Sequence, residues 1–414
     1  MFKKLKIIKY YLGTKQFSYK QDIEEYQKQK LSKLLKNLKS DFYPKSQSLE
    51  DFPIINKKIF MENFDTINTL GITQKDALSV ALQAEQSRNF TSKIGDITVG
   101  LSSGTSGSRG VFLVSEEESA RWAGYILKKM LPEPLLQKHK IAFFLRANSN
   151  LYESVNSSLI SFKFYDLMIP LKEHIKILNK TQPSIIIAPA QVLRLLAQSN
   201  QLDIEPKKII SVAEVLEEDD RAIIEMRFSQ PVHQVYQCTE GFLAHTCKEG
   251  NLHLNEDIVF IEKEWIDKKS FRFIPIVTDL NRLTQPVIRY RLDDILILDE
   301  EACSCGSAFT RIKSIEGRCD DILKMRTLKD EEYLLFPDFI RRAIISIDTN
   351  LNEYKVLKDD NTLHIYLDPI SVKSEVEEAL SKLYENHKIK PLKHQFHPHK
   401  VEKLDKKRRR VQQL

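Results

Sequence analysis

A loop of small and hydroxylated residues is the most prominent chemical feature of the chain. Residues 101–110 read LSSGTSGSRG and lie between the strand-like segments DITVG and VFLVS. Glycines let a backbone approach phosphate oxygens, Ser and Thr hydroxyls add donors, and Arg109 adds a charged, forked donor. No Gly-Lys-Ser/Thr opens a helix here, which excludes a Walker loop. The pattern predicts either a phosphate-binding loop between two strands or a flexible surface turn.

Three later segments carry side chains suited to a nucleotide. In VYQCTEGFLA (235–244), Tyr236 can stack on a base, while Thr239 and Glu240 are hard oxygen ligands for Mg²⁺. In PVIRYRLDD (286–294), an acidic side chain can bind both ribose hydroxyls, and in IEGRCDDILK (315–324), Arg318 can reach a nucleotide. Taken singly, such residues are more often surface ion pairs or core aromatics, so only their combination indicates a nucleotide site.

The elements that must position these residues form an α/β pattern. Residues 1–90 read mainly as helix, with apolar positions three and four apart around Ile23–Leu38 and Ala77–Arg88. The segments DITVGL, KIAFFL, SIIIAPA and KKIISVA predict buried strands of one α/β sheet, covered by helices at Gln191–Gln198 and Glu217–Phe228. Residues 250–298 predict a smaller β-rich region. The last 95 or so residues mix strand and helix patterns, which predicts a small α+β domain.

The order and spacing of these motifs resemble those of the acyl-adenylate-forming superfamily. The phosphate loop is followed by YxxTE, RYRxxD, GRxDD and a basic C-terminal motif. The chain is most similar to the branch that contains phenylacetate–CoA ligase, deazaflavin-coenzyme adenylylating synthetases and capsule-cluster homologues. Further matches to it are FPIINK (52–57), GITQKDALSVALQAEQSRNF (71–90), SVAEVL (211–216) and GNLHLNED (250–257). The resemblance covers nearly the whole chain.

This resemblance implies an α/β fold with two domains. A large ATP- and acid-binding domain, with mixed sheets and a β-rich subdomain, is expected over residues 1–317. A small mobile α+β lid domain is expected over residues 318–414. Asp320 falls where the superfamily places the hinge between the two domains.

The resemblance also implies a role for each motif residue. Ala213 and Glu214 are expected beside the adenine, with Tyr236 stacked on it. Thr239 is expected to contact the α-phosphate and Glu240 to hold Mg²⁺, while Asp294 and Arg318 bind the ribose. The loop residues expected to hold the β- and γ-phosphates run from Ser102 to Gly110: Ser102, Ser103, Gly104, Thr105, Ser106, Gly107, Ser108, Arg109 and Gly110.

A lysine near the C-terminus is expected to bridge the substrate carboxylate and the α-phosphate. The segment KLDKKRRRV offers Lys406 or Lys407 for this role, and the sequence does not separate them. Outside the family context, the same run is equally typical of a solvated basic tail.

The chain departs from the superfamily pattern at three motifs. The phosphate loop ends in Arg109-Gly110 where Lys-Gly is usual, which keeps the charge and changes its geometry. Gln237 stands where glycine is common in YxxTE. Leu292-Asp293-Asp294 replaces the usual Thr-Gly-Asp. These departures leave the prediction of a nucleotide site in place, but they put the individual contacts of the three motifs in doubt.

Three cysteines and one histidine form two short pairs in the sequence. Cys303-Ser304-Cys305-Gly306 resembles the Cys-x-Cys-Gly element of this branch, and Cys247 and His253 flank the turn-like KEGN upstream. Three thiolates and one imidazole would complete a closed, structural zinc site. The alternative is ordinary thiols and a loop histidine. Cys238 and Cys319 have no such partners and are expected to be packing residues.

The resemblance implies an ATP-dependent ligase for a small carboxylic acid. The acid would be converted to acyl-AMP with release of pyrophosphate, and the acyl group then passed to a thiol of coenzyme A or a carrier protein. Residues 143–157 fall where the branch builds its acid pocket, with Arg146 and Tyr152 as candidate lining residues and an aryl acid as the favoured class. Two alternatives remain: AMP transfer to a phenolic hydroxyl, and a non-catalytic nucleotide-binding homologue.

Composition limits the other classes of function. Hydrophobic residues make up 42% and charged residues 29%, as in a globular protein, and the net charge of +6 is modest and brings no nucleic-acid-binding motif with it. No apolar run approaches the roughly 20 residues of a membrane span. The start, MFKKLKIIKYYLG, predicts a surface helix, with contact to a membrane surface as the alternative. Five cysteines without a secretion signal predict thiols or metal ligands in a reducing cytoplasm.

Overall fold

The chain forms two compact units. The computed structural model describes residues 2–102, 110–132, 137–148, 152, 155–347, 351–400, 404 and 407–414. Unit 1 comprises Met1–Leu292 and Ile297–Ser314, and unit 2 comprises Asp293–Leu296 and Ile315–Leu414. The chain passes from one unit to the other after Leu292 and again within two strands, β14 (Asp294–Asp299) and β15 (Arg311–Arg318).

The N-terminal part of unit 1 is helical, as its periodicity predicted. Its helices are α1 (Phe2–Gly13), α2 (Lys20–Lys36), η1 (Leu49–Asp51), α3 (Lys57–Glu62), α4 (Phe64–Ile67) and α5 (Gln74–Ser87). Side chains cap two of them: Asn56 accepts a hydrogen bond from Ile59 N at the start of α3, and Thr73 accepts one from Asp76 N at the start of α5. The cap at Asn56 fixes where Lys57 begins its helix.

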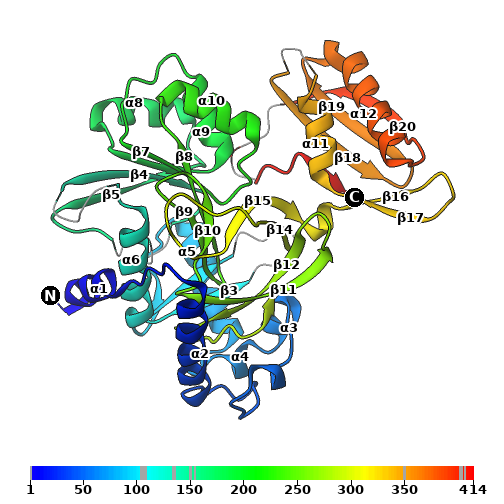
Figure 1. Cartoon of the computed structure of the whole chain (residues 1–414). Coiled ribbons are helices and arrows are strands. Elements are labelled where there is room, and N and C mark those ends of the chain that lie inside the picture. Colours follow the sequence, from blue (N-terminus) through cyan, green and yellow to red (C-terminus); the bar gives the residue numbers. More distant parts are fainter. Residues whose placement is uncertain are drawn as a thin grey trace. The chain divides into compact units, whose positions relative to one another are not determined.

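A parallel sheet forms the centre of unit 1 (Figure 1). Its strand order is β5-β4-β6-β7-β8, and every neighbouring pair in it is parallel. The helix α6 (Glu116–Met130) packs on one face, where it meets Ile141, Ile185 and Ile210. The ring of His174, on α8, meets Phe144 on the opposite face. The other elements are β4 (His139–Leu145), β5 (Ile160–Asp166), α8 (Leu171–Thr181), β6 (Ile185–Ala188), α9 (Ala190–Gln198), β7 (Lys208–Val212), α10 (Glu218–Phe228) and β8 (Val232–Cys238).

The same sheet continues beyond β8, where β8–β9, β9–β10, β10–β15 and β11–β12 pair antiparallel. From β8 its order is β9, β10, β15, β14, β12 and β11, with β13 paired to β12. The predicted β-rich region therefore extends the main sheet. Its strands are β9 (Gly241–Thr246), β10 (Leu252–Leu254), β11 (Val259–Asp267), β12 (Arg272–Asp279) and β13 (Tyr290–Arg291).

The segment DITVGL was wrongly assigned to the main sheet. It forms β2 (Ile97–Leu101), which pairs antiparallel with β1 (Lys93–Ile94) and β3 (Val111–Val114) in a separate three-stranded sheet. The physical reason is the short link between β2 and β3. Such a link can reverse the chain, whereas parallel strands need a long crossover. The expectation that the loop lies between two strands is confirmed.

Unit 2 has its own sheet and core. Strands β18 (Glu353–Asp359), β19 (Thr362–Asp368), β20 (Lys393–Pro398) and β21 (Val411–Gln413) form a sheet in the order β20-β19-β18-β21. Leu380, Val356 and Ile365 are fully buried between this sheet and the helices. The remaining elements are η2 (Cys319–Asp321), β16 (Leu323–Arg326), β17 (Glu332–Leu335), α11 (Pro337–Ile345), η3 (Ile370–Val372) and α12 (Lys373–His387). The predicted α+β character of the tail is confirmed.

Among the described residues, no helix combines the length and the apolar character that a membrane crossing requires.

Candidate active site and metal centre

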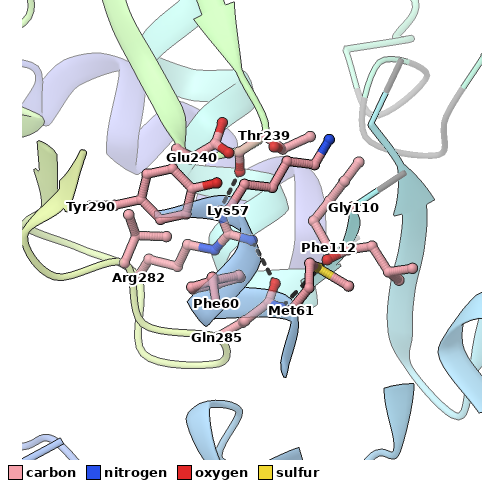
Figure 2. A pocket seen from close by; sticks show the side chains of 12 residues that line it. Lys57, Phe60, Met61, Gly110, Phe112, Thr239, Glu240, Arg282, Gln285 and Tyr290 are labelled. Carbon is pink, nitrogen blue, oxygen red and sulfur yellow. Dashed lines mark hydrogen bonds between the residues drawn. The ribbon is translucent and has the colours of Figure 1, made fainter. Parts of the chain in front are cut away.

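A hollow in unit 1 gathers residues from segments that are distant in sequence. It lies between α3, the start of β3 and the turn after β8 (Figure 2). Part of its wall is apolar, with Phe60 and Tyr290 in edge-to-face contact at a centroid distance of 5.4 Å. Its lining residues are Lys57, Phe60, Met61, Gly110, Val111, Phe112, Thr239, Glu240, Arg282, Gln285, Val287 and Tyr290.

The phosphate loop begins and ends beside this hollow. Ser102 N donates to Gly110 O at 2.7 Å, and Gly110 N donates to Ser102 Oγ, also at 2.7 Å. These two bonds close the base of the loop. A Cβ at Gly110 would lie 3.2 Å from Ser102 Oγ and 3.4 Å from Lys57 Cε, so the absence of a side chain keeps this point open. The predicted phosphate ligands Ser103, Gly104, Thr105, Ser106, Gly107, Ser108 and Arg109 lie outside the described residues.

Thr239 and Glu240 form the turn between β8 and β9, and both line the hollow. The backbone of this turn is held by Arg282. The guanidinium of Arg282 donates to Thr239 O at 2.5 Å and to Gln285 Oε1 at 3.0 Å. Gln285 Oε1 also accepts from Leu113 N at 3.0 Å, on the strand that leaves the phosphate loop. Buried hydrogen bonds thus connect the Thr239–Glu240 turn to the loop strand.

A second carboxylate supports the segment that carries Arg282. Glu118 Oε1 accepts hydrogen bonds from Leu283 N and Thr284 N, both at 2.9 Å. Burial raises the pKa of Glu118, but hydrogen bonds from the Thr284 and Ser115 backbones outweigh it and the pKa lies below its ordinary value. Glu118 therefore stays ionised at neutral pH and keeps this segment in place.

The residues predicted to lie beside the adenine meet at the carboxyl ends of β7 and β8. The strands pair in parallel with Val212 opposite Val235, which places Ala213 beside Tyr236. Ala213 has a φ of 66°, a left-handed conformation that residues other than glycine rarely adopt. Ligands commonly bind at this edge of a parallel sheet.

Glu214 is engaged by protein groups. Its carboxylate accepts from Arg146 Nη2 at 2.8 Å and from Gln191 N at 3.3 Å, and its side chain is 1% exposed. Arg146, a predicted acid-pocket residue, therefore holds the loop that follows β7. The other predicted pocket residue, Tyr152, packs against Phe143 and Trp122 at centroid distances of 4.8 and 5.7 Å. Trp122 Nε1 in turn donates to Gln237 Oε1 at 3.1 Å.

The predicted ribose and hinge residues belong to unit 2. Arg318 Nε lies 3.8 Å from Asp294 Oδ1, so the two expected ribose ligands face each other. Cys319 N donates to Asp293 O at 2.7 Å, and the expected hinge residue Asp320 follows in the short helix η2. Asp321 accepts from Arg318 N at 3.3 Å and from Arg409 Nε at 3.0 Å.

The three arginines of the C-terminal basic segment, Arg408 to Arg410, are not part of a solvated tail. Arg410 Nε donates to Glu353 Oε1 at 2.6 Å and Arg408 Nη1 to Glu353 Oε2 at 3.2 Å, while Arg409 bonds Asp321. The alternative interpretation as a solvated run is wrong for these three residues. Lys407 directly precedes them, and Lys406 lies outside the described residues.

The two short Cys/His pairs come together in one cluster. One ligand atom from each of Cys247, His253, Cys303 and Cys305 lies within 4.8 Å of the others. The Cys247 and Cys303 Sγ atoms are 3.8 Å apart, and Cys305 Sγ is 3.7 Å from His253 Nε2. Tetrahedral Zn²⁺ with Zn–S bonds of about 2.3 Å requires a sulfur–sulfur separation of about 3.8 Å. The donor set and spacing fit zinc.

Neighbouring groups prepare these side chains to bind a metal. His253 Nδ1 lies 2.9 Å from Phe309 O, which leaves Nε2 toward the thiols. Gly250 and Gly306, both at φ 79°, form the tight turns behind Cys247 and Cys305. Burial raises the pKa of Cys303, but hydrogen bonds from the Cys305 backbone and the His253 side chain outweigh it and lower the pKa to about 6.

Two cations and one amide that line the hollow had no role assigned from the sequence. Lys57 ends the FPIINK match, and Arg282 and Gln285 lie in the segment before PVIRYRLDD. In the sequence, Lys57 is marked only weakly, as a cation one residue after a helix N-cap. Nothing in the sequence indicates that Arg282 pairs with Gln285, because this contact depends on β3, which lies far earlier in the chain. These residues become visible only once the fold closes the hollow.

Comparison with known proteins identifies the fold. No protein-family model matches the chain. A segment of 104 residues is 30% identical to phenylacetate-coenzyme A ligase of Thermus thermophilus, and this match spans 25% of the chain and 21% of that enzyme. A structure of 2-hydroxyisobutyryl-CoA ligase in the postadenylation state with 2-HIB-AMP matches with a TM-score of 0.64 at 16% identity, over 98% of this chain and 86% of that one.

Two further solved structures agree with this result. ATP-bound MatB from Rhodopseudomonas palustris matches with a TM-score of 0.56 at 13% identity, over 78% of this chain and 67% of that one. The anthranilate CoA ligase AuaEII, in complex with anthranoyl-AMP, matches with a TM-score of 0.54 at 12% identity, over 75% and 66%. At these identities the likeness establishes the fold. The chain therefore has the fold of the acyl-adenylate-forming ligases, the superfamily that its motifs resemble.

Proposed function

We propose that this protein is an ATP-dependent ligase that activates a small carboxylic acid as its acyl-AMP and then transfers the acyl group to a thiol, with coenzyme A favoured as the acceptor. The observation that carries the proposal is the position of the Thr239–Glu240 turn and Gly110 in one hollow. In this arrangement the Glu240 carboxylate lies on the same hollow as the end of the predicted phosphate loop. Structures of a ligase with the same fold contain 2-HIB-AMP and CoA, and this supports the choice of an acyl-AMP and of CoA here.

The first half-reaction needs no protein nucleophile. A carboxylate oxygen attacks the α-phosphorus of ATP, the bond to the β-phosphate oxygen breaks, and pyrophosphate leaves. The protein contributes position and charge. Thr239 would contact the α-phosphate, Asp294 and Arg318 the ribose, and Lys406 or Lys407 the reacting carboxylate.

Mg²⁺ is the metal that this chemistry requires, and the residues present fit it. Glu240 offers a carboxylate and Thr239 a hydroxyl, both hard oxygen donors that line the hollow. A bound Mg²⁺ would neutralise charge on the phosphates. The Cys247–His253–Cys303–Cys305 cluster is proposed to hold structural Zn²⁺ instead, because four protein ligands leave no open position.

An aromatic acid is the substrate class we favour. Trp122, Phe143 and Tyr152 form an aromatic group beside Gln237, two residues before the Thr239–Glu240 turn. Aromatic rings offer flat apolar surface to an aryl acid.

The proposal is tested by acid-dependent pyrophosphate release. The protein is incubated with MgATP, hydroxylamine as trap, and a panel of aryl and aliphatic acids. We expect release with one class of acid, lowered by about two orders of magnitude in Glu240→Gln. Glu62→Gln, an exposed carboxylate on α3, is the matched control and should keep full activity.

The products separate the remaining possibilities. Release of AMP after addition of CoA supports thioester formation. AMP retained in a product with a phenolic hydroxyl would point to adenylyl transfer. Binding of ATP without turnover of any acid would leave a nucleotide-binding homologue and overturn the proposal.

A further inference from the structure

Helix α1 is the feature of the chain that the proposed function does not use. We propose that its outward face is a docking surface for a lipid bilayer that carries anionic headgroups. Docking by α1 does not depend on the adenylating activity, because the described residues that line the hollow include none from this helix. The partner has a stated chemistry: an apolar layer covered by negative charge.

The inward face of α1 is fixed to the protein by α6 (Figure 1). Ile7 is 9% exposed and packs, with Tyr11, in the same core cluster as α6. The two helices approach each other at their backbones, since a Cβ on Gly124 of α6 would lie 2.8 Å from both Ile7 O and Tyr11 N. Tyr10 adds an edge-to-face contact with Tyr125 at a centroid distance of 6.4 Å. Tertiary packing therefore holds α1 as a helix, and its opposite face points away from α6.

The outward face of α1 is an apolar ridge formed by Leu5, Ile8 and Leu12. These side chains are 56%, 46% and 75% exposed. Their spacing of three and four residues places them on one side of the helix. A single exposed leucine is ordinary on a protein surface. Three large apolar side chains in one row, on a helix whose other side is anchored, are typical of a helix that lies in a membrane interface.

The charges of α1 are all positive. The helix carries four lysines and no acidic residue. At about 100° per residue, Lys4 lies on one side of the apolar ridge and Lys9 on the other, and both are exposed. Lys6 is turned toward α6, where its Nζ lies 3.0 Å from Glu117 Oε2 and 3.5 Å from Glu116 Oε1. Both of these acidic side chains are thus ion-paired, and positive charge borders the ridge.

A bilayer fits this face better than a second copy of the chain does. In a twofold-symmetric dimer the same surface patch meets itself, so Lys4 and Lys9 of one copy would approach the lysines of the other. Like charges in contact repel. Anionic headgroups instead neutralise the lysines, while the acyl chains beneath them take up the apolar ridge. The combination of an apolar row and flanking lysines therefore favours an anionic membrane.

The test is co-sedimentation of the full chain with vesicles of phosphatidylcholine, with and without phosphatidylglycerol. We expect binding where the anionic lipid is present, and weaker binding as the salt concentration rises. The triple substitution Leu5→Gln, Ile8→Gln and Leu12→Gln should lower the affinity at least about 10-fold, because it removes the apolar ridge. Lys4→Gln with Lys9→Gln should lower it about 10-fold, because each lysine contributes to attraction by the headgroups.

Substitutions on two other helices of unit 1 serve as matched controls. Met226→Gln removes an apolar side chain that is 78% exposed on α10. Lys28→Gln with Lys33→Gln removes two exposed lysines from α2. Both controls should bind anionic vesicles as the wild type does. Glutamine is as good a helix former as leucine and lysine, and the substituted side chains of α1 point away from α6, so melting temperatures should be unchanged.

Three results would overturn the proposal. The first is wild-type protein that stays in the supernatant with anionic vesicles or binds both kinds of vesicle equally. The second is an equal loss of binding in the two lysine pairs, which would assign binding to net charge. The third is a dimer in sedimentation velocity that the ridge substitutions dissociate, because the face would then belong to a second copy. Acid-dependent pyrophosphate release without vesicles should be the same in all variants, so its absence from the wild type bears on the proposed function alone.

Discussion

At the scale of single residues, the groups expected to do chemistry are held by groups without a chemical motif. Thr239 is the clearest case, since its carbonyl is bound by Arg282, and Arg282 is in turn bound to Gln285. The motif YxxTE was enough to predict a role for Thr239. The hydrogen bond that holds Thr239 could not be predicted, because hydrogen-bond partners depend on which strands the fold brings together.

Loss of Arg282 should therefore weaken both stability and nucleotide binding. Arg282→Met removes donors to Thr239 O, Leu113 O and Gln285 and leaves buried acceptors without them. We expect a loss of about 2–4 kcal/mol in the free energy of unfolding, measured in urea, and a higher KM for MgATP. Lys382→Met, which breaks an exposed pair with Glu378, should cost much less. Equal stability of the two variants would contradict the prediction.

The limits of sequence reasoning are visible at the same scale. Ser102 and Gly110 were assigned to phosphate binding, and the structure shows that they also close the base of the loop. Glu214 was assigned to the adenine side, and its carboxylate turned out to hold Arg146 and the start of α9. Residue type predicts which chemistry is available, whereas geometry decides which neighbour uses it.

At the scale of elements, apolar runs predicted strands well and sheet membership poorly. KIAFFL, SIIIAPA and KKIISVA are β4, β6 and β7 of the parallel sheet, but DITVGL is β2 of a different sheet. A run of apolar residues indicates that a strand is buried. It does not indicate which strand pairs with it; for β2, the partner β3 follows from the short loop between them.

The segments that carry the Cys/His cluster should depend on zinc. Cys247 lies in the turn after β9, His253 in β10, and Cys303 and Cys305 in the turn before β15. We expect one equivalent of Zn²⁺ in purified protein by atomic absorption, and a lower melting temperature after treatment with a strong chelator. Cys303→Ser should lose the metal and Cys238→Ser should keep it. A chelated protein with an unchanged melting temperature would argue for free thiols.

The pairing of β8 with β9 should make stability depend on pH. Burial, with help from the positive charges of Lys208 and Arg221, lowers the pKa of His233 to about 4. The unfolded chain takes up this proton near pH 6.5, so stability is full above that pH and is lost as the pH falls toward 4. Because His233 is partly exposed, we expect a loss of about 1–2 kcal/mol.

His233→Gln isolates this contribution. Glutamine can keep a hydrogen bond to Thr246 Oγ1, which lies 2.9 Å from His233 Nδ1, but it does not titrate. The free energy of unfolding, measured in urea between pH 7 and 4.5, should fall less steeply for the variant than for the wild type. Parallel curves would show that His233 titrates normally.

At the scale of the whole molecule, each of the two units has hydrophobic core of its own. That of unit 2 is formed by residues between Leu323 and Val411, and that of unit 1 lies around α6 and around α5. The sequence predicted the small α+β character of the tail. It did not predict that Asp293–Leu296 belong to unit 2, because so short a segment does not indicate which core it joins.

Separate cores should give separate unfolding transitions. Glu353 is the best probe of unit 2, because it accepts hydrogen bonds from Arg408 and Arg410, whose side chains are 7% and 1% exposed. Glu353→Gln removes the negative charge between two buried cations and should cost about 2–4 kcal/mol. In differential scanning calorimetry we expect two transitions, of which this variant lowers only one.

Chelation of zinc should act on the other transition, because Cys247, His253, Cys303 and Cys305 all belong to unit 1. The two perturbations together form a cross-check, since each should leave the opposite transition in place. A single transition that both perturbations lower would mean that the units unfold together. Loss of the Arg408–Glu353 and Arg410–Glu353 contacts and loss of zinc would then lower the stability of the same cooperative unit. The lid expected over residues 318–414 would not unfold independently.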